Sequence, residues 1–353
     1  MVRCAGRRYA RPVVRRAATI PAPVAAARST RSAACPCWKA DRMTELPKRR
    51  LGRSGMEPAA VGLGGAWWHK AGRQGTIAGI EAALELGMNF LDTYPGQDEQ
   101  TWGDVLAEGG RRDRVYLQAK VSSHVRNERT SDHSAARTRS SVEASLRDLR
   151  TDYLDSVLIH GYDQPEQLQT DDIVDPLAPG NALDELLRLK EEGKVRHIGI
   201  GARNAEVHRR AIDTGHIELI LTYLEYNLLT QAAATELFPL CREKDVGVIL
   251  ASPLAMGLLT GAEPDAENEQ RKIRDMTEPK THRMWSWCRE RDIDIRHLAI
   301  QFCMAAPVDG FVLPGQASAD EVRSSYKAGM AVVSVDVWRE FGEAFGIDVS
   351  ALV

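Results

Sequence analysis

From Leu46 onward the sequence alternates short apolar runs with longer amphipathic stretches, and this alternation limits the possible folds more than any other feature. Apolar runs that end at turn residues predict strands, and apolar residues repeating every three to four positions predict helices. The predicted strands are 58–63, 88–91, 115–119, 154–159, 195–200, 219–222, 247–250 and 311–313. The predicted helices are 74–86, 99–107, 135–149, 181–192, 206–212, 232–243, 280–290 and 319–327, with one inserted helix over 295–305.

Eight strand–helix units predict an α/β protein with a parallel sheet. Eight such strands can close into a (β/α)8 TIM barrel, which forms a single domain. A doubly wound open sheet is the alternative, but no Gly-x-Gly-x-x-Gly pattern follows the first strand. We therefore expect one barrel, with functional side chains at the carboxyl ends of its strands.

The first 42 residues differ in composition from the rest. No Asp or Glu occurs from Met1 to Ala40, while Arg, Ala, Ser and Pro are abundant. Two interpretations fit: translation starts at Met43, or the segment is an organellar transit peptide. In both cases we expect a disordered extension over 1–42 and the barrel over 43–353. The protein is then expected to be cytoplasmic, or organellar if the transit peptide is genuine.

Charge and hydropathy argue against two classes of partner. The formal net charge is −3 at pH 7, whereas nucleic-acid binders normally carry a basic face. No stretch approaches the roughly 18 apolar residues that a membrane span needs. Cys35 and Cys37 have no second ligand pair at zinc-like spacing, so no metal is expected. The expected partner is a small-molecule substrate, and the sequence leaves the oligomeric state open.

Side chains able to manage protons follow three successive predicted strands. Asp92 ends the second strand, Lys120 the third and His160 the fourth, and Tyr94 follows Asp92 by two residues. Hydride transfer to a carbonyl leaves an alkoxide, which needs a nearby proton donor. An ammonium lowers the pKa of a neighbouring tyrosine hydroxyl, a carboxylate holds that ammonium, and a histidine orients the carbonyl oxygen. The pattern predicts a catalytic group that moves a hydride between a carbonyl and an alcohol.

Five segments in chain order carry a resemblance to a known family. They are GMNFLDT (87–93), VYLQAK (115–120), DSVLIH (155–160), LKEEGKVRHIG (189–199) and SPLAMGLLTG (252–261). Together they resemble the aldo-keto reductase superfamily, over residues 50 to about 328. The last segment, with YLEYNLL (223–229), is most similar to the branch that oxidises L-galactose or D-arabinose. The resemblance implies an NAD(P)-dependent oxidoreductase, either an aldose 1-dehydrogenase or an aldehyde reductase.

The tyrosine departs from the pattern of that family. The family has an Asp, Tyr, Lys, His tetrad, and Asp92, Lys120 and His160 fall on its motif positions. Its usual run is Asp-Thr-Ala-x-x-Tyr-Gly, whereas this chain reads DTYPG over 92–96. Either Tyr94 reaches the same place through a rebuilt loop, or the proton donor is lost. In the second case the protein is a cofactor-binding pseudoenzyme or regulatory subunit, or a biosynthetic enzyme with altered chemistry.

The resemblance also implies where a nicotinamide cofactor is held. The implied contact residues are Ser252, Leu254, Gly257, Leu259, Gly315, Ser318 and Glu321. The first four surround the pyrophosphate, and Gly257 permits close backbone approach. The other three open the last predicted helix, whose N-terminal amides favour anions. NADPH-specific relatives usually place an Arg where Ala317 stands. Its absence, with Asp320 and Glu321 nearby, favours NAD over NADP, while Arg323 keeps NADP open.

Aromatic side chains follow the first predicted strand, where a barrel loop reaches over the site. Trp67, Trp68 and His69 stand in this loop. Aromatic faces suit sugar rings or apolar carbonyl substrates. We expect these residues to line the substrate pocket, with packing inside the loop as the alternative.

Overall fold

The computed structural model describes residues 44–94, 98–122, 124–125, 128–129, 132–161, 174–264 and 278–353. The chain divides into two units, Met1–Pro36 and Cys37–Val353, and every described residue belongs to the second unit. The extension predicted over 1–42 therefore lies outside the described residues.

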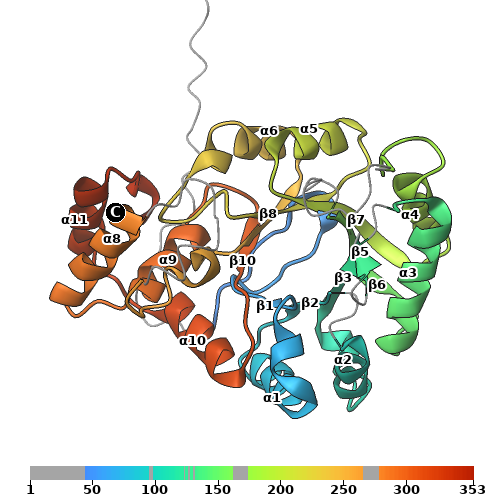
Figure 1. The fold of residues 1–353 in the computed structure, drawn as a ribbon, viewed down its shortest axis with the longest axis horizontal. Helices are drawn as coiled ribbons and strands as arrows, with labels where there is room; N and C mark the ends of the chain where they lie inside the picture. Colours follow the sequence, from blue (N-terminus) through green and yellow to red (C-terminus); the bar gives the residue numbers. More distant parts are fainter. Residues whose placement is uncertain are drawn as a thin grey trace, which may run out of the picture. The chain divides into compact units, whose positions relative to one another are not determined.

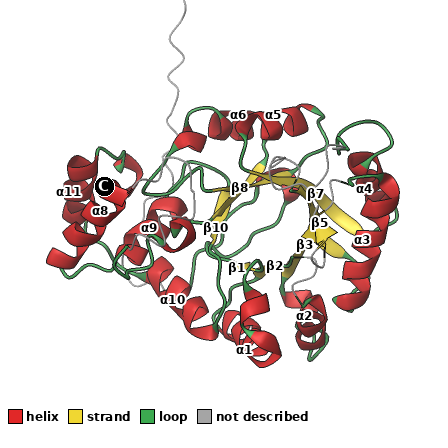
Figure 2. Ribbon diagram, in the orientation of Figure 1, coloured by secondary structure: helices red, strands yellow, loops and turns green. Residues whose placement is uncertain are grey.

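Eight parallel strands form one sheet in the order β1-β2-β3-β6-β7-β8-β9-β10. They are β1 (Leu63–Gly64), β2 (Phe90–Asp92), β3 (Tyr116–Ser122), β6 (Leu154–His160), β7 (Val195–Ala202), β8 (Leu219–Tyr223), β9 (Gly247–Ala251) and β10 (Gly310–Leu313). Parallel bridges from Val61 to Val312 and from Gly64 to Gly315 join the last strand to the first. These bridges close the sheet, so the predicted (β/α)8 barrel is confirmed; Figure 2 shows its strands surrounded by helices. A small antiparallel hairpin, β4 (His124–Val125) with β5 (Glu128–Arg129), follows β3 and was not predicted.

The helices follow the strands in the expected alternation. They are α1 (Gly72–Glu85), α2 (Glu99–Leu106), α3 (Ala135–Asp148), α4 (Ala182–Glu191), α5 (Ala205–Asp213), α6 (Leu237–Lys244), α8 (Glu278–Glu290), α9 (Ile295–Met304), α10 (Ala319–Met330) and α11 (Val335–Phe345). Ser134, Asp294 and Ser318 cap α3, α9 and α10, because each side chain accepts a hydrogen bond from a backbone N–H of the first turn. The sequence prediction missed α11, and it merged the 3-10 turn Ala232–Ala234 with α6.

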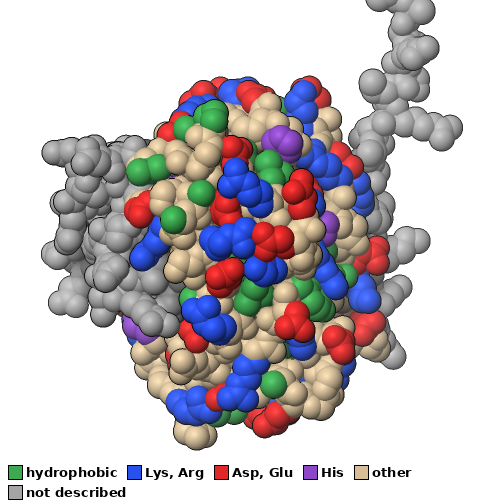
Figure 3. Space-filling model, turned by 90° about the vertical axis from the view of Figure 1, so that its right-hand side faces the viewer, with side chains coloured by type: hydrophobic (Ala, Val, Ile, Leu, Met, Phe, Trp, Pro, Cys, Tyr) green, Lys and Arg blue, Asp and Glu red, His purple; other side chains and the backbone are tan. Residues whose placement is uncertain are grey.

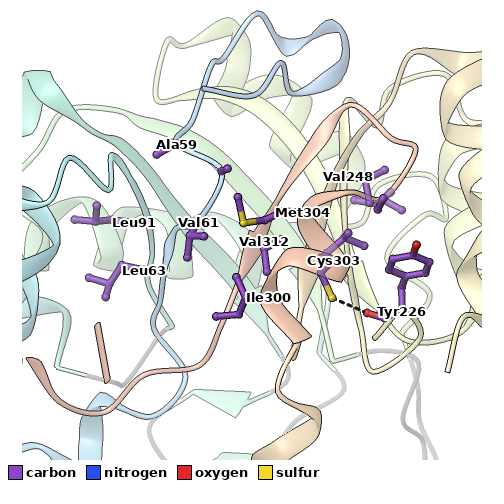
Figure 4. Packing of buried hydrophobic residues seen from close by; sticks show 14 of the residues in the cluster. Ala59, Val61, Leu63, Leu91, Tyr226, Val248, Ile300, Cys303, Met304 and Val312 are labelled. Atoms are coloured by element: carbon purple, nitrogen blue, oxygen red, sulfur yellow. Dashed lines mark hydrogen bonds between the residues drawn. The ribbon is translucent and has the colours of Figure 1, made fainter. Parts of the chain in front are cut away.

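The helix that covers the barrel between β9 and β10 is α9, which reverses the sequence prediction. Figure 4 shows Ile300, Cys303 and Met304 of α9 gathered with Val248 of β9 and Val312 of β10 in one buried cluster. The sequence pattern instead predicts that the helix over 280–290 follows β9 and covers the barrel, with 295–305 as the inserted helix, and this prediction is wrong. The physical reason is visible in α9, which is apolar almost all round, as expected of a helix buried between a sheet and other helices.

The inserted helix is α8, which packs outside α9. It lies beside the C-terminal helix α11 in Figure 1. The ring of Trp287 in α8 lies 5.3 Å from that of Phe341 and 6.2 Å from that of Phe345, both edge-on. These aromatic contacts join α8 and α11 into a layer outside the barrel.

Apolar side chains fill the barrel interior up to the level of the strand ends. Phe90, Leu158, Ile249 and Phe311 are buried there, and the rings of Phe90 and Phe311 lie 4.5 Å apart. Leu51, from the segment before β1, closes the amino-terminal end of the barrel and is fully buried. Toward the carboxyl end the buried residues of β2, β3 and β6 become polar, among them Asp92, Gln118 and Ser156, so this end is the candidate site.

Charges of both signs are mixed on the face of the molecule shown in Figure 3, where α3 and α4 lie. Arg139 of α3 pairs with Glu192 at 2.6 Å and Glu185 at 2.5 Å, and Lys194 pairs with Glu143 at 3.1 Å. Glu185 is buried beneath these pairs, while the other four side chains are partly or largely exposed, so solvent screens most of this network. No helix in the described part of the chain is long and apolar enough to cross a membrane.

Candidate active site

A buried ion pair between Asp92 and Lys120 forms the centre of the site. Asp92 ends β2 and Lys120 lies in the neighbouring β3, and their side chains are only 5% and 4% exposed. Lys120 Nζ donates to Asp92 Oδ1 and, at 3.0 Å, to the backbone oxygen of Thr93. An ammonium has three N–H donors, so two are held by these acceptors and the third can serve another partner.

Tyr94 and His160 stand next to this ion pair. Lys120 Nζ lies 5.1 Å from the centre of the Tyr94 ring, and the Tyr94 and His160 rings meet edge-on at 5.5 Å. Tyr223, at the end of β8, approaches His160 from the other side with 6.2 Å between ring centres. The four residues predicted from the strand ends therefore lie together at the barrel mouth. Of the DTYPG segment over 92–96, the structure describes residues 92–94. Residues 95–97 lie outside the described residues.

The orientation of His160 limits what its ring can do. Nδ1 lies 2.9 Å from the backbone oxygen of Gly201 in β7. A carbonyl oxygen only accepts hydrogen bonds, so Nδ1 carries the proton in this contact. A contact between this ring and a substrate oxygen would therefore involve Nε2.

Two polar residues beneath the ion pair were missed by the sequence analysis. Gln118 Nε2 donates to Asp92 Oδ1 at 2.7 Å, and Ser156 Oγ donates to Gln118 Oε1 at 2.9 Å. The sheet register pairs Asp92 with Gln118 and Gln118 with Ser156, so all three stand at one level of the barrel. The period-two alternation could have found them, because Gln118 and Lys120 are two residues apart on one strand face.

A third missed residue, Glu99, supports the site from the helical layer. Its carboxyl contacts Thr93 Oγ1 at 2.8 Å and Ser145 Oγ at 2.9 Å. Burial raises the pKa of Glu99, although the hydrogen bonds from Thr93 and Ser145 oppose that effect. The backbone oxygen of Thr93 also accepts a hydrogen bond from Lys120. Thr93 therefore links the Glu99 carboxyl to the Lys120 ammonium.

The loop after β9 has an unusual backbone, and it contains the predicted pyrophosphate contacts Ser252, Leu254, Gly257 and Leu259. Three non-glycine residues adopt positive φ angles, at 59° for Ser252, 47° for Ala255 and 55° for Met256, and Gly257 has φ 107°. Each non-glycine residue in this region costs about 1 kcal/mol or more, and such conformations cluster at ligand-binding sites. The N–H groups of Ala255, Gly257, Leu258 and Leu259 donate to the backbone oxygens of Ser252, Leu254 and Ala255, so this backbone forms a tight, internally hydrogen-bonded turn.

The segment after β10 carries the remaining predicted cofactor residues. Ser318 Oγ accepts from the backbone N–H of Glu321 at 3.2 Å, and Glu321 accepts from that of Ala317 at 2.6 Å. Both side chains therefore cap α10, and the Glu321 carboxylate lies at the N-terminus of this helix. Gly315 lies against the ring of Trp67, where a Cβ atom would come within 2.7 Å of two ring atoms.

The three predicted pocket residues after β1 separate into two environments. Trp67 is half-buried at the mouth with Lys70 Nζ 4.3 Å above its ring, and His69 is exposed nearby. Trp68 is instead fully buried, where Nε1 donates to the Gly64 oxygen at 3.0 Å. Its ring meets Trp102 of α2 edge-on at 6.3 Å, so Trp68 packs in the core rather than lining the pocket. The prediction for Trp68 is wrong because a turn of 3-10 helix directs adjacent side chains to different sides.

No cluster of three His, Cys, Asp or Glu side chains suited to a metal ion occurs in the described ranges. The arrangement brings an ammonium, a phenol and an imidazole close together. That combination can transfer a proton to or from an oxygen.

Comparisons with known proteins give consistent relatives. A model of the aldo/keto reductase family matches residues 60–344. The chain is 30% identical over 311 residues to L-galactose dehydrogenase of Arabidopsis thaliana, covering 84% of this chain and 92% of that protein. It is 28% identical over 291 residues to a D-threo-aldose 1-dehydrogenase of Pseudomonas sp, covering 75% and 86%. The solved holo form of aldo-keto reductase AKR11C1 from Bacillus halodurans has a TM-score of 0.66 at 28% identity, covering 85% of this chain and 96% of that one.

Proposed function

The chain belongs to the aldo/keto reductase family, and from this premise we propose that its chemistry takes place among Asp92, Tyr94, Lys120 and His160. As a member of the family it is an NAD(P)-dependent oxidoreductase that acts on small carbonyl or alcohol compounds. The single observation that carries the site assignment is the buried Asp92–Lys120 ion pair beside Tyr94 and His160.

When bound, the nicotinamide ring supplies or accepts the hydride. In the proposed reduction the Tyr94 hydroxyl delivers a proton to the developing alkoxide, and the Lys120 ammonium stabilises the phenolate that remains. Asp92 holds that ammonium. With the Nδ1 proton directed at the Gly201 oxygen, His160 Nε2 accepts from a substrate hydroxyl in the neutral ring and donates to a carbonyl oxygen only when the ring is doubly protonated. In alcohol oxidation the same phenolate accepts the proton.

Two loops are the proposed place of the cofactor that this chemistry requires. The loop over 252–257, whose positive-φ backbone is of the kind that clusters at ligand-binding sites, is the proposed place of the pyrophosphate. Gly315, Ser318 and Glu321 lie at the start of α10, the proposed place of the adenosine ribose. We favour NAD over NADP here, because the Glu321 carboxylate would repel a 2′-phosphate and no Arg stands at Ala317. The double variant Ala317→Arg with Glu321→Gln should raise kcat/KM for NADP relative to NAD by about tenfold or more.

An aldose sugar is the substrate we propose first. The Arabidopsis and Pseudomonas relatives are named for oxidation of L-galactose and of D-threo-aldoses. The half-buried Trp67 at the mouth offers an aromatic face of the kind that packs on sugar rings. Aldehyde reduction is the second candidate, and it uses the same four side chains in the opposite direction.

Reduced-nicotinamide absorbance tests the proposal directly. Wild-type protein is assayed with aldoses plus NAD or NADP, and with aldehydes plus the reduced cofactors. Lys120→Met should abolish turnover, whereas Lys244→Met, which removes an exposed lysine on α6, serves as the matched control. Tyr94→Phe should also lower kcat sharply while cofactor binding persists. Unchanged turnover in Lys120→Met would contradict the assignment of the site.

A further inference from the structure

We propose that Gln118 is a positioning residue for hydride transfer, and that Ser156 satisfies the far end of its amide. The inference deepens the proposed function and rests on it, because it concerns the support of the Asp92–Lys120 pair. Gln118 touches neither substrate nor cofactor in this scheme and acts only through Asp92.

Burial makes the amide of Gln118 unfavourable unless its polar atoms are hydrogen-bonded. Its neighbours in the barrel interior are apolar, as with Phe90, Leu158 and Phe311. Gln118 and Ser156 are both 0% exposed. Burying an amide there costs free energy unless both of its ends are hydrogen-bonded. Here both ends are bonded, to Asp92 at one end and to Ser156 at the other.

The chemistry of Asp92 gives this chain of bonds a direction. A carboxylate only accepts, so the Nε2 end of the amide must face Asp92 and the Oε1 end must face Ser156. The Ser156 hydroxyl then donates to Oε1, so both ends of the amide are satisfied in the orientation that Asp92 selects. The chain runs Ser156 to Gln118 to Asp92, across three neighbouring strands that are in register.

Gln118 and Lys120 donate to the same carboxylate oxygen, Asp92 Oδ1. This shared acceptor fixes the point at which the Lys120 ammonium is held, while the Thr93 oxygen supplies its second contact. Loss of the amide would leave the buried carboxylate with one donor fewer and allow it to rotate. The ammonium would then move relative to Tyr94, and small displacements of this kind lower turnover strongly.

The central test is Gln118→Leu, which keeps the approximate volume and removes the amide. We expect kcat to fall about 10- to 100-fold with KM within about threefold, since hydrogen bonds to charged groups are lost. Ser156→Ala keeps the bond from the amide to Asp92 but leaves the buried Oε1 without its donor, so a smaller loss of about two- to tenfold is expected. The matched control is Gln301→Leu on α9, whose amide donates to the Ala328 oxygen in the outer helical layer. That control should lower the melting temperature without changing the pH profile of kcat.

A pH profile separates positioning from simple packing. In Gln118→Glu, two neighbouring carboxyls share one proton at lower pH, so the protonated one still donates to the other. Its kcat should approach the wild-type value near pH 6 and fall progressively as the pH rises and this proton is lost. Gln118→Leu should show no such recovery at any pH.

Three results would overturn the inference. One is a Gln118→Leu protein with wild-type kcat and pH profile, and another is a Gln118→Glu protein that matches Gln118→Leu at every pH. The third result applies if Gln118→Leu does not fold, and it is a Gln118→Glu protein whose pH profile of kcat matches the wild type. In that case a loss of kcat at alkaline pH that the wild type does not show supports the inference. Failure of the proposed function would show differently, as turnover that survives Lys120→Met.

Discussion

Lowering the pH should destabilise this protein through one buried histidine, His133, which precedes α3 and is 2% exposed. Burial lowers the pKa of His133 from 6.5 to about 4, and the neighbouring His160 adds to the effect, while Asp132 and Asp175 oppose it. The folded protein thus takes up this proton only well below the pH at which the unfolded chain does. Stability is complete above the unfolded value and is lost as the pH falls toward the folded value.

The size of the effect follows from the two pKa values. The gap between 6.5 and about 4 corresponds to about 3 kcal/mol once both states are fully protonated. At pH 5 the unfolded chain is mostly protonated and the folded chain mostly neutral, so about 2 kcal/mol is already lost. That is a large fraction of the roughly 5–15 kcal/mol that holds a typical domain folded.

Urea denaturation at pH 7.5 and pH 5 measures this loss in the wild type and in His133→Gln. The variant has a different absolute stability, but its free energy of unfolding should fall by about 2 kcal/mol less between the two pH values. The control is His216→Gln, which replaces an exposed histidine after α5 and should keep the wild-type difference. A His133→Gln protein whose loss matches the wild type within about 0.5 kcal/mol would refute the reasoning.

Three further predictions concern stability. Because burial raises the pKa of Glu99 above 4.5, the fold favours its protonated form and loses stability as the pH rises from that value through the folded pKa. Glu99→Gln should therefore melt above the wild type by a margin that grows over this interval and stays constant above it. The Cζ atoms of Arg112 and Arg196 lie 4.1 and 3.7 Å from the centre of the Tyr153 ring. Tyr153→Leu should therefore lower the free energy of unfolding, measured in urea, by about 1–2 kcal/mol, and an unchanged denaturation midpoint would contradict this. A Cβ at Gly79 would lie 2.0 Å from the Trp68 ring. Gly79→Ala should therefore lower the melting temperature, because overpacking costs about 1–3 kcal/mol, which exceeds the gain from the better helix propensity of Ala. A higher melting temperature would argue against this.

Periodicity explains why the barrel and the strand-end residues could be predicted. In a strand, alternate residues face the interior, and a parallel sheet brings all its carboxyl ends to one edge. Asp92, Lys120 and His160 could therefore be placed together from their positions alone, and the described geometry does bring them together. Gln118 obeys the same rule, but its position on the strand does not show which side chains of the neighbouring strands it bonds.

Residues outside regular strands could not be placed in this way. Trp67 and Trp68 are adjacent in sequence, and only the 3-10 turn decides that one faces the mouth and the other the core. The exchange of roles between α8 and α9 has a related cause. Amphipathicity identifies a helix with one buried face, whereas α9 is buried nearly all round and its sequence pattern does not show which elements cover it.

The barrel mouth has two chemically different walls, and this division organises the proposed mechanism. Asp92, Lys120 and His160, which we propose to handle the proton, come from the adjacent strands β2, β3 and β6. The proposed cofactor loops follow β9 and β10, on the other side of the barrel opening. A carbonyl group bound between the walls would receive its hydride from one side and its proton from the other. Substitutions on the β2–β6 wall should therefore change the pH profile of kcat at constant cofactor affinity, and substitutions in the loops after β9 and β10 should do the reverse.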